Sequence, residues 1–193
     1  MLISGSGTNL QALIDAQEAG ALGARIAVVV SDRADARGLQ RASDAGIATE
    51  VISWGADRAA STVALCDLVS SHGAELLVLA GFMRILGPEA VRRFPDRIVN
   101  VHPSLLPSFP GAHAVEQALE YGAKLTGVTV HLVDEEVDHG PVICQQAVPV
   151  LDGDDAASLH RRIQEAEHRL FPEAVAAMAQ GRISVNGRKV VWS

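Results

Sequence analysis

The chain has 193 residues, and its 16 Lys and Arg against 23 Asp and Glu give a formal net charge of −7. With 48% hydrophobic and 20% charged residues, its composition is that of one globular domain and excludes a disordered chain. It shows no basic stripe, no apolar run near the roughly 20 residues that cross a bilayer, and no leader-like N-terminus. We therefore expect a cytoplasmic protein with no nucleic-acid partner and no membrane partner.

Apolar runs of strand length alternate along the chain with stretches of helical spacing. In chain order, the predicted elements are a strand at Leu2–Ile3, a helix over Thr8–Glu18, a strand over 25–31, a helix over 35–45, a strand over 49–53, a helix over 57–72, strands over 75–80 and 97–101, a helix over 112–121, paired strands over 125–133 and 141–150, and a helix over 155–180. Pro172 can bend the last helix because proline removes a backbone donor. Asn186 and Gly187 predict a hairpin turn in roughly the last 12 residues.

This alternation of strands and helices is typical of βαβ units. The predicted fold class is α/β, with a doubly wound, mostly parallel sheet, flanking helices and one domain over residues 1–193 whose end is a C-terminal hairpin or tail. The first strand of such a sheet is central, but residues 1–4 are fewer than the about five or six of a usual strand. Either this strand is unusually short or the chain begins upstream.

A glycine-rich turn at residues 4–10, Ser-Gly-Ser-Gly-Thr-Asn-Leu, follows the first strand and opens a helix. Glycines let the backbone approach a ligand, and a helix N-terminus offers free N–H groups and a positive dipole end. The turn therefore suits a phosphate group. It is neither a P-loop nor the full dinucleotide fingerprint, and a plain turn with Thr8 or Asn9 as helix cap remains an alternative.

Residues 100–107, Asn-Val-His-Pro-Ser-Leu-Leu-Pro, follow another predicted strand, at the end where such folds bind ligands. Asn100 and His102 are two apart and point to the same side of that strand. An amide donor beside an imidazole suits the oxyanion that develops when a carbonyl is attacked. The alternative is a turn in which both side chains bond local backbone groups.

An acidic loop at residues 134–138 carries four carboxylates in five positions. Such a cluster is commonly a solvated surface or a weak metal site, but one carboxylate beside His102 could instead accept a proton. Asp138, next to a His-Gly-Pro turn, is the best placed. His113, His131 and His139 lack the spacing of metal ligands, so we expect no metal.

Four motifs in order and in register, at residues 4–10, 80–86, 100–107 and 137–141, resemble those of the folate-dependent phosphoribosylglycinamide formyltransferases. The resemblance extends from residue 2 to about residue 180. It implies a Rossmann-like fold and an enzyme that transfers the formyl group of 10-formyltetrahydrofolate, a co-substrate, to the amine of phosphoribosylglycinamide. The products would be formylglycinamide ribonucleotide and tetrahydrofolate, in purine biosynthesis.

The resemblance also implies roles for individual residues. The catalytic residues would be Asn100, His102 and Asp138. The phosphoribosylglycinamide site would comprise Gly7, Thr8, Asn9, Pro103, Ser104, Gln164 and Glu167. The folate site would comprise Met83, Arg84, Ile85, Leu86, Asn100, Val133 and Asp138, largely through backbone groups. Leu132 departs from the family, which often has an aromatic residue there, and the family has several more residues before Leu2.

Three other functions are compatible with parts of this sequence. A formyltetrahydrofolate deformylase shares the catalytic core but lacks the glycine-rich phosphate loop and carries an extra domain. A methionyl-tRNA formyltransferase adds a C-terminal RNA-binding barrel. A non-catalytic nucleotide-binding module could use the same fold, although Asn100, His102 and Asp138 argue against it. The oligomeric state, a homodimer included, is not readable from the sequence.

Overall fold

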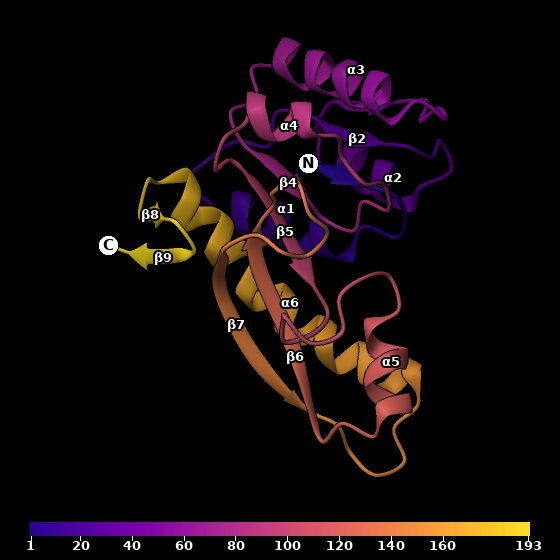
Figure 1. Ribbon diagram of the computed structural model, residues 1–193. Helices are drawn as coiled ribbons and strands as arrows, with labels where there is room; N and C mark the ends of the chain where they lie inside the picture. Colours follow the sequence, from indigo (N-terminus) through magenta and orange to yellow (C-terminus); the bar gives the residue numbers. More distant parts are fainter.

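The computed structural model describes all residues 1–193 and has a central seven-stranded sheet between two layers of helices (Figure 1). The strand order is β3-β2-β1-β4-β5-β6-β7, and β8 and β9 form a separate hairpin. The strands are β1 (Leu2–Ile3), β2 (Val29–Ser31), β3 (Thr49–Val51), β4 (Leu77–Leu79), β5 (Ile98–His102), β6 (Leu125–Leu132), β7 (Val142–Pro149), β8 (Ile183–Asn186) and β9 (Lys189–Trp192). The helices are α1 (Thr8–Glu18), α2 (Arg37–Asp44), α3 (Arg58–Ser71), α4 (Pro88–Arg93), α5 (Ala114–Tyr121) and α6 (Ala156–Ala179).

The first five strands are parallel, which confirms the predicted doubly wound sheet of an α/β fold. β6 runs antiparallel to β5, and β7 antiparallel to β6. Because β6 is antiparallel to β5, it ends at Leu132 opposite Val99, near the start of β5. The acidic loop, residues 133–141, follows from there, and it folds back along β5 so that Asp138 reaches His102 at the end of that strand.

Successive residues along each central strand point to opposite faces of the sheet and pack in different hydrophobic cores, as expected for strands that are covered on both faces. Ile3, Val78 and Val99 pack in the larger core, with Leu10 of α1 and Phe171 of α6. The residues just before them in the sequence, which are Leu2, Leu77 and Ile98, pack in the second core under α3 and α4. Asn100 and His102 continue the alternation of Ile98, which places their side chains toward the second face.

The amino end of β1 is tied to the residue before β2. Met1 nitrogen donates a hydrogen bond to Val28 oxygen at 2.9 Å. The strand predicted over 25–31 forms only at Val29–Ser31, the residues that pair with β1 and β3. A cavity of about 620 Å³ lies at this end, with Met1, Ile26, Val28, Leu76 and Val78 among the lining residues.

One helix of the structure was absent from the prediction, and the predicted last helix is present. The short helix α4 was not predicted, since six residues carry too little periodicity to be recognised. α6 continues as one helix through Pro172, with Asp155 as its N-cap.

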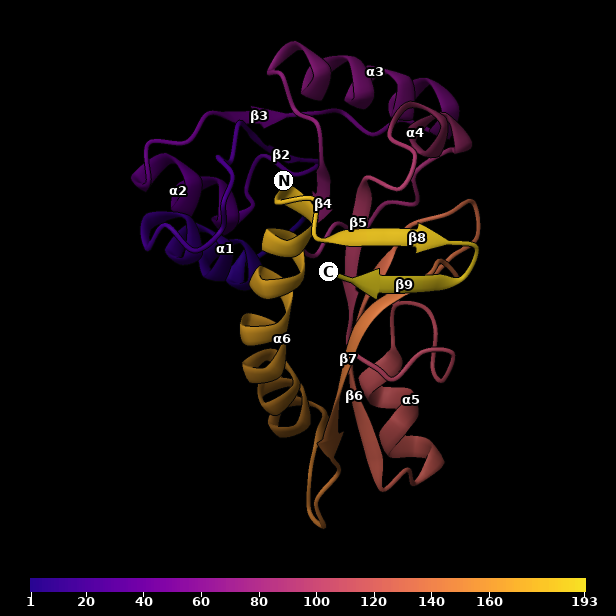
Figure 2. The ribbon, with the colours of Figure 1, turned by 90° about the vertical axis from the view of Figure 1, so that its left-hand side faces the viewer.

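Within the chain, no helix combines the length and the apolar character that a membrane crossing needs. The hairpin predicted around Asn186 and Gly187 is present as β8 and β9 (Figure 2).

Candidate active site

The strand order reverses between β1 and β4, and α/β sheets bind ligands at the carboxyl ends of the strands beside such a reversal. Here the loops after β1 and β4 are tied together. Ser4 nitrogen donates to Gly81 oxygen at 3.0 Å, and Met83 nitrogen donates to Ser4 Oγ at 2.8 Å. Arg84 Nε lies 2.6 Å from Oδ2 of the buried Asp32, which follows β2. The glycine-rich turn and residues 83–86 therefore border one site.

The glycine-rich turn is held tightly against the start of α2. Gly7 has a φ of 71°, and a Cβ there would lie 2.6 Å from the Cα of Gly38. Gly38 nitrogen donates to Gly5 oxygen at 3.1 Å, and Arg41 Nε donates to Ser6 oxygen at 2.9 Å. No side chain caps α1, so the N–H groups of its first turn remain available to an anion. This excludes the capped-turn alternative for Thr8 and Asn9.

Asn9 instead connects α1 to α6. Its Nδ2 donates to Glu167 Oε2 at 2.8 Å, and Glu167 is only 5% exposed. Asn9 Oδ1 is buried without a partner, so it can accept a hydrogen bond from a ligand. Gln164 is half-buried on α6, one turn before Glu167. The predicted phosphate-binding and ribose-binding residues thus lie on two helices that pack together.

Asn100 of β5 lies opposite His131 of β6 in the antiparallel register. Its Nδ2 is 3.2 Å from His131 Nε2, while His131 Nδ1 is 2.8 Å from Leu132 oxygen. Burial lowers the pKa of His131. A neutral ring that donates from Nδ1 to the carbonyl leaves Nε2 to accept from Asn100. The second N–H of the Asn100 amide stays free for a substrate oxygen.

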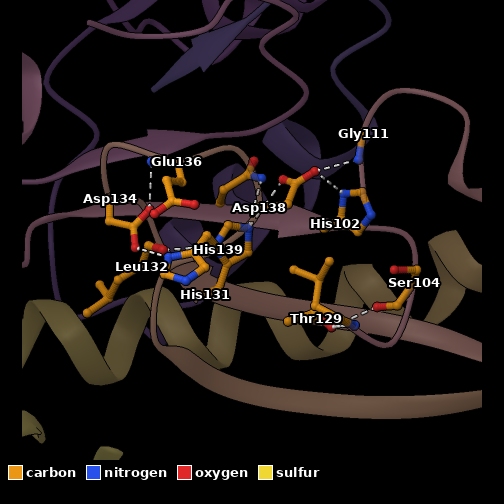
Figure 3. Close-up of polar contacts among 12 residues, drawn as sticks. His102, Ser104, Gly111, Thr129, His131, Leu132, Asp134, Glu136, Asp138 and His139 are labelled. Atoms are coloured by element: carbon orange, nitrogen blue, oxygen red, sulfur yellow. Dashed lines mark hydrogen bonds and ion pairs between the residues drawn. The ribbon is translucent and has the colours of Figure 1, made fainter. Parts of the chain in front are cut away.

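His102 ends β5 and faces Asp138 from the acidic loop (Figure 3). His102 Nδ1 is 3.4 Å from Asp138 Oδ2, and its Nε2 is 2.8 Å from Phe109 oxygen. Asp138 Oδ2 also accepts from Gly111 nitrogen at 2.7 Å, and its Oδ1 is 3.7 Å from His131 Nε2. A protonated His102 ring can donate to both facing oxygens.

Asp138 has a φ of 53°, in the left-handed region that costs a side-chain-bearing residue energy. That backbone directs its carboxylate inward, where the side chain is 10% exposed. Of the four carboxylates in the acidic loop, this is therefore the one that reaches His102, as the sequence analysis expected.

The remaining predicted residues have differing environments. Met83 and Ile85 are 68% and 54% exposed, so they offer an apolar surface beside the turn. Val133 nitrogen donates to Ile98 oxygen at 2.8 Å. Ser104 is fully buried; its hydroxyl donates to Ser108 oxygen and its carbonyl oxygen accepts from Thr129 Oγ1 at 2.7 Å, so only its main-chain N–H is left to meet a substrate. Pro103, just before it, is half-buried.

His131 is the residue of this cluster that the sequence analysis did not assign to the site. Its contact with Asn100 depends on which residues of two antiparallel strands lie opposite each other. The alternation of residues within the strand 125–133 was visible, but the register was not, because it depends on the β5–β6 pairing. No group of three or more His, Cys, Asp or Glu is arranged to hold a metal ion.

Comparisons with known proteins agree with this geometry. The family model described as formyl transferase matches residues 1–175. A phosphoribosylglycinamide formyltransferase of Mycobacterium tuberculosis is 46% identical over 190 residues, which cover 97% of this chain and 87% of the relative. The trifunctional purine biosynthetic protein adenosine-3 of Bos taurus is 45% identical over 196 residues and the whole chain, but the chain spans only 19% of that protein's length.

Among solved structures, glycinamide ribonucleotide transformylase 1 from Symbiobacterium toebii superposes with a TM-score of 0.97 at 49% identity. The match covers 99% of this chain and 91% of the other. The sequence relationship and the backbone agreement extend over the strands and loops that carry Asn100, His102 and Asp138. The chain therefore belongs to the formyl transferase family, and within it to the phosphoribosylglycinamide formyltransferases.

Proposed function

We propose that this formyl transferase moves the formyl group of 10-formyltetrahydrofolate to the amine of phosphoribosylglycinamide in de novo purine biosynthesis. The observation that carries the proposal is the convergence of Asn100, His102 and Asp138 at the edge of the sheet where β1 leads into the uncapped N-terminus of α1, two strands away. An amide donor, an imidazole and a carboxylate meet there next to a site for a phosphate.

The phosphoribosylglycinamide would bind across α1 and α6. Main-chain N–H groups of Gly7, Thr8 and Asn9 would hold its phosphate, because no other group in the structure uses them. Gln164 and Glu167 would contact the ribose and amine side, and Pro103 and the main chain of Ser104 would border it. The buried, unpartnered Oδ1 of Asn9 supports a ligand that donates a hydrogen bond there.

The folate would bind between the loop after β4 and the acidic loop. The exposed apolar side chains of Met83 and Ile85 suit an aromatic ligand. Backbone groups of residues 83–86 and 133–138 would form hydrogen bonds with the polar edge of its pterin ring. Arg84 forms an ion pair with Asp32, and this pair would hold the loop after β4 in place. No metal is required by this arrangement.

In the mechanism we propose, the substrate amine attacks the formyl carbon directly, a C–N bond forms, and the carbonyl π electrons move to oxygen. The free N–H of Asn100 donates to that oxyanion, and the positive charge of a protonated His102 stabilises it, while the two ring nitrogens of His102 keep their contacts with Asp138 and Phe109 oxygen. Asp138 accepts the proton that the amine loses, directly or through a water. The electron pair on oxygen then re-forms the carbonyl as the bond from carbon to the folate nitrogen breaks, and the proton held by Asp138 passes to that nitrogen, directly or through a water.

Two effects would supply most of the rate. An oxyanion donor such as Asn100 is worth about 3 kcal/mol of barrier. Alignment of two bound substrates is worth up to about 10 kcal/mol. The fixed orientation of Asn100 by His131 supports the first effect, because a donor that is already oriented needs no reorganisation during the reaction.

The test follows folate absorbance during formyl transfer, with and without phosphoribosylglycinamide, for the wild type and for His102→Ala. Turnover that requires the amine and collapses in the variant supports the proposal. Folate turnover without the amine would make the protein a formyltetrahydrofolate deformylase. No turnover in either assay, from a folded protein, would favour a nucleotide-binding module. Cytoplasmic location and a metal-free reaction stay predictions, and gel filtration would give the oligomeric state.

A further inference from the structure

The C-terminal hairpin, β8 and β9, lies beside the acidic loop that carries Asp138 (Figure 2). An isolated two-stranded hairpin is marginally stable, and this one is fastened to the main sheet. Trp192 Nε1 donates to Ile143 oxygen of β7 at 3.0 Å. The bond fixes the hairpin next to the strand that leaves the acidic loop.

Arg188, in the hairpin turn, bonds the acidic loop directly. Its Nη2 donates to His139 oxygen at 2.7 Å, and its Nη1 lies 3.3 Å from His139 Nε2. His139 Nδ1 is 2.7 Å from Asp134 Oδ2, and Asp134 Oδ1 accepts from Glu136 nitrogen at 3.0 Å. These contacts link the Arg188 guanidinium through His139 to Asp134 in the loop. Its positive charge also partly balances the negative charge of the nearby carboxylates.

These contacts matter because of where the loop bends. His139 directly follows Asp138, whose left-handed backbone is energetically costly without support from its surroundings. Apart from the bonds of the Asp138 carboxylate itself, Arg188 provides the hydrogen bonds that reach residues 134–139 from outside the loop. The position of the Asp138 carboxylate therefore depends on two sets of contacts. One is its own contacts with Gly111 and His102, and the other is the contact of Arg188 with the next residue, His139.

We propose that Arg188 is a positioning residue for Asp138, and that the C-terminal hairpin is a working part of the folate side of the site. This inference rests on the proposed function. Arg188 touches no reacting atom. It acts through the His139 carbonyl, which it fixes, and so keeps the loop in the conformation that presents Asp138 to His102.

The test compares Arg188→Gln with Arg188→Lys, and with Arg182→Gln as a matched control. Arg182 is on the same C-terminal segment, but its guanidinium bonds Gln180 and not the acidic loop. For Arg188→Gln we expect KM for 10-formyltetrahydrofolate to rise and kcat to fall, each about three- to ten-fold, with KM for phosphoribosylglycinamide unchanged. Lysine should restore part of the loss, because it can donate to the His139 carbonyl but cannot also reach the ring.

Hydrogen exchange gives a readout that does not depend on turnover. In Arg188→Gln, the amides of residues 134–139 should exchange several-fold faster, while those of Val185 and Val190 in the hairpin stay as in the wild type. If the wild type shows no amine-dependent turnover, the proposed function fails, and exchange alone decides whether Arg188 orders the loop. Unchanged loop exchange together with unchanged folate KM, or equal effects in Arg182→Gln, would overturn the inference.

Discussion

The Nδ1 atom of His102 lies 3.4 Å from the Oδ2 atom of Asp138, although one residue ends a central strand and the other sits in a loop of a neighbouring hairpin. The Gly111 N–H bonds the same carboxylate oxygen and so fixes its direction. The carboxylate is thereby oriented before any substrate arrives, which is the condition for efficient proton transfer.

Replacement of Asp138 by Asn tests this relationship. The amide keeps the shape and can still accept from Gly111, but it carries no negative charge and takes up no proton. We expect kcat to fall about 10²- to 10³-fold, with an unchanged thermal midpoint by circular dichroism. Near-normal kcat in a folded Asp138→Asn protein would remove Asp138 from the catalytic residues.

Asn100 and His131 provide a second pair with separable roles. Asn100→Ala removes the proposed oxyanion donor, and we expect kcat to fall about 10²-fold, equivalent to roughly 3 kcal/mol, with little change in either KM. His131→Ala leaves the Asn100 amide in place but no longer oriented, so kcat should fall less than in Asn100→Ala. Single-turnover rates of both variants check this order, and a larger loss in His131→Ala would contradict the assigned roles.

Local patterns were sufficient for much of the architecture. The β-branched runs and the helical spacing identified the alternation of elements, and the glycine-rich turn was placed correctly before α1. The Asn-x-His spacing put Asn100 and His102 on one side of β5 because side-chain direction in a strand is a local property.

What the sequence analysis missed depends on pairing between distant segments. The direction of β6 and the contact of Asn100 with His131 follow from the register of two strands. The extent of β2 follows from its pairing with β1 and β3. Arg188 reaches His139 only because the hairpin is docked on β7. None of these has a local signature.

Gly7 and Gly20 separate two costs of a side chain in the left-handed region. Both have a φ of 71°, but a Cβ on Gly7 would meet the Gly38 backbone, whereas one on Gly20 would meet nothing within 4 Å. Gly20→Ala should cost about 1 kcal/mol of unfolding free energy, and Gly7→Ala about 1–3 kcal/mol more.

Only Gly7→Ala should also raise KM for phosphoribosylglycinamide, because only this glycine lies in the proposed phosphate site. Urea unfolding and steady-state kinetics on the same samples measure the two effects. Equal destabilisation of the two variants would show that the backbone around Gly7 can shift to accommodate a Cβ at little cost. An unchanged KM for phosphoribosylglycinamide in Gly7→Ala would argue against a phosphate at this turn.

The buried amine of Met1 predicts a stability that depends on pH. Burial lowers its pKa from 8.0 to about 5, while its nitrogen donates to Val28 oxygen. Between these values the unfolded chain binds a proton that the folded chain does not, so the free energy of unfolding should rise with pH from about 5 to 8. An N-acetylated chain keeps the N–H donor and loses the charge, and its acetyl group can enter the cavity that Met1 lines.

Subtraction of the two stability curves cancels the contributions of the histidines and carboxylates, which both proteins share. We expect the acetylated chain to gain at least about 1 kcal/mol relative to the free amine on going from pH 8.5 to pH 5.5. Urea unfolding of both proteins at each pH measures the difference. A difference that does not vary with pH would mean that the amine is protonated in the folded protein and that water, rather than the edge of the sheet, surrounds it.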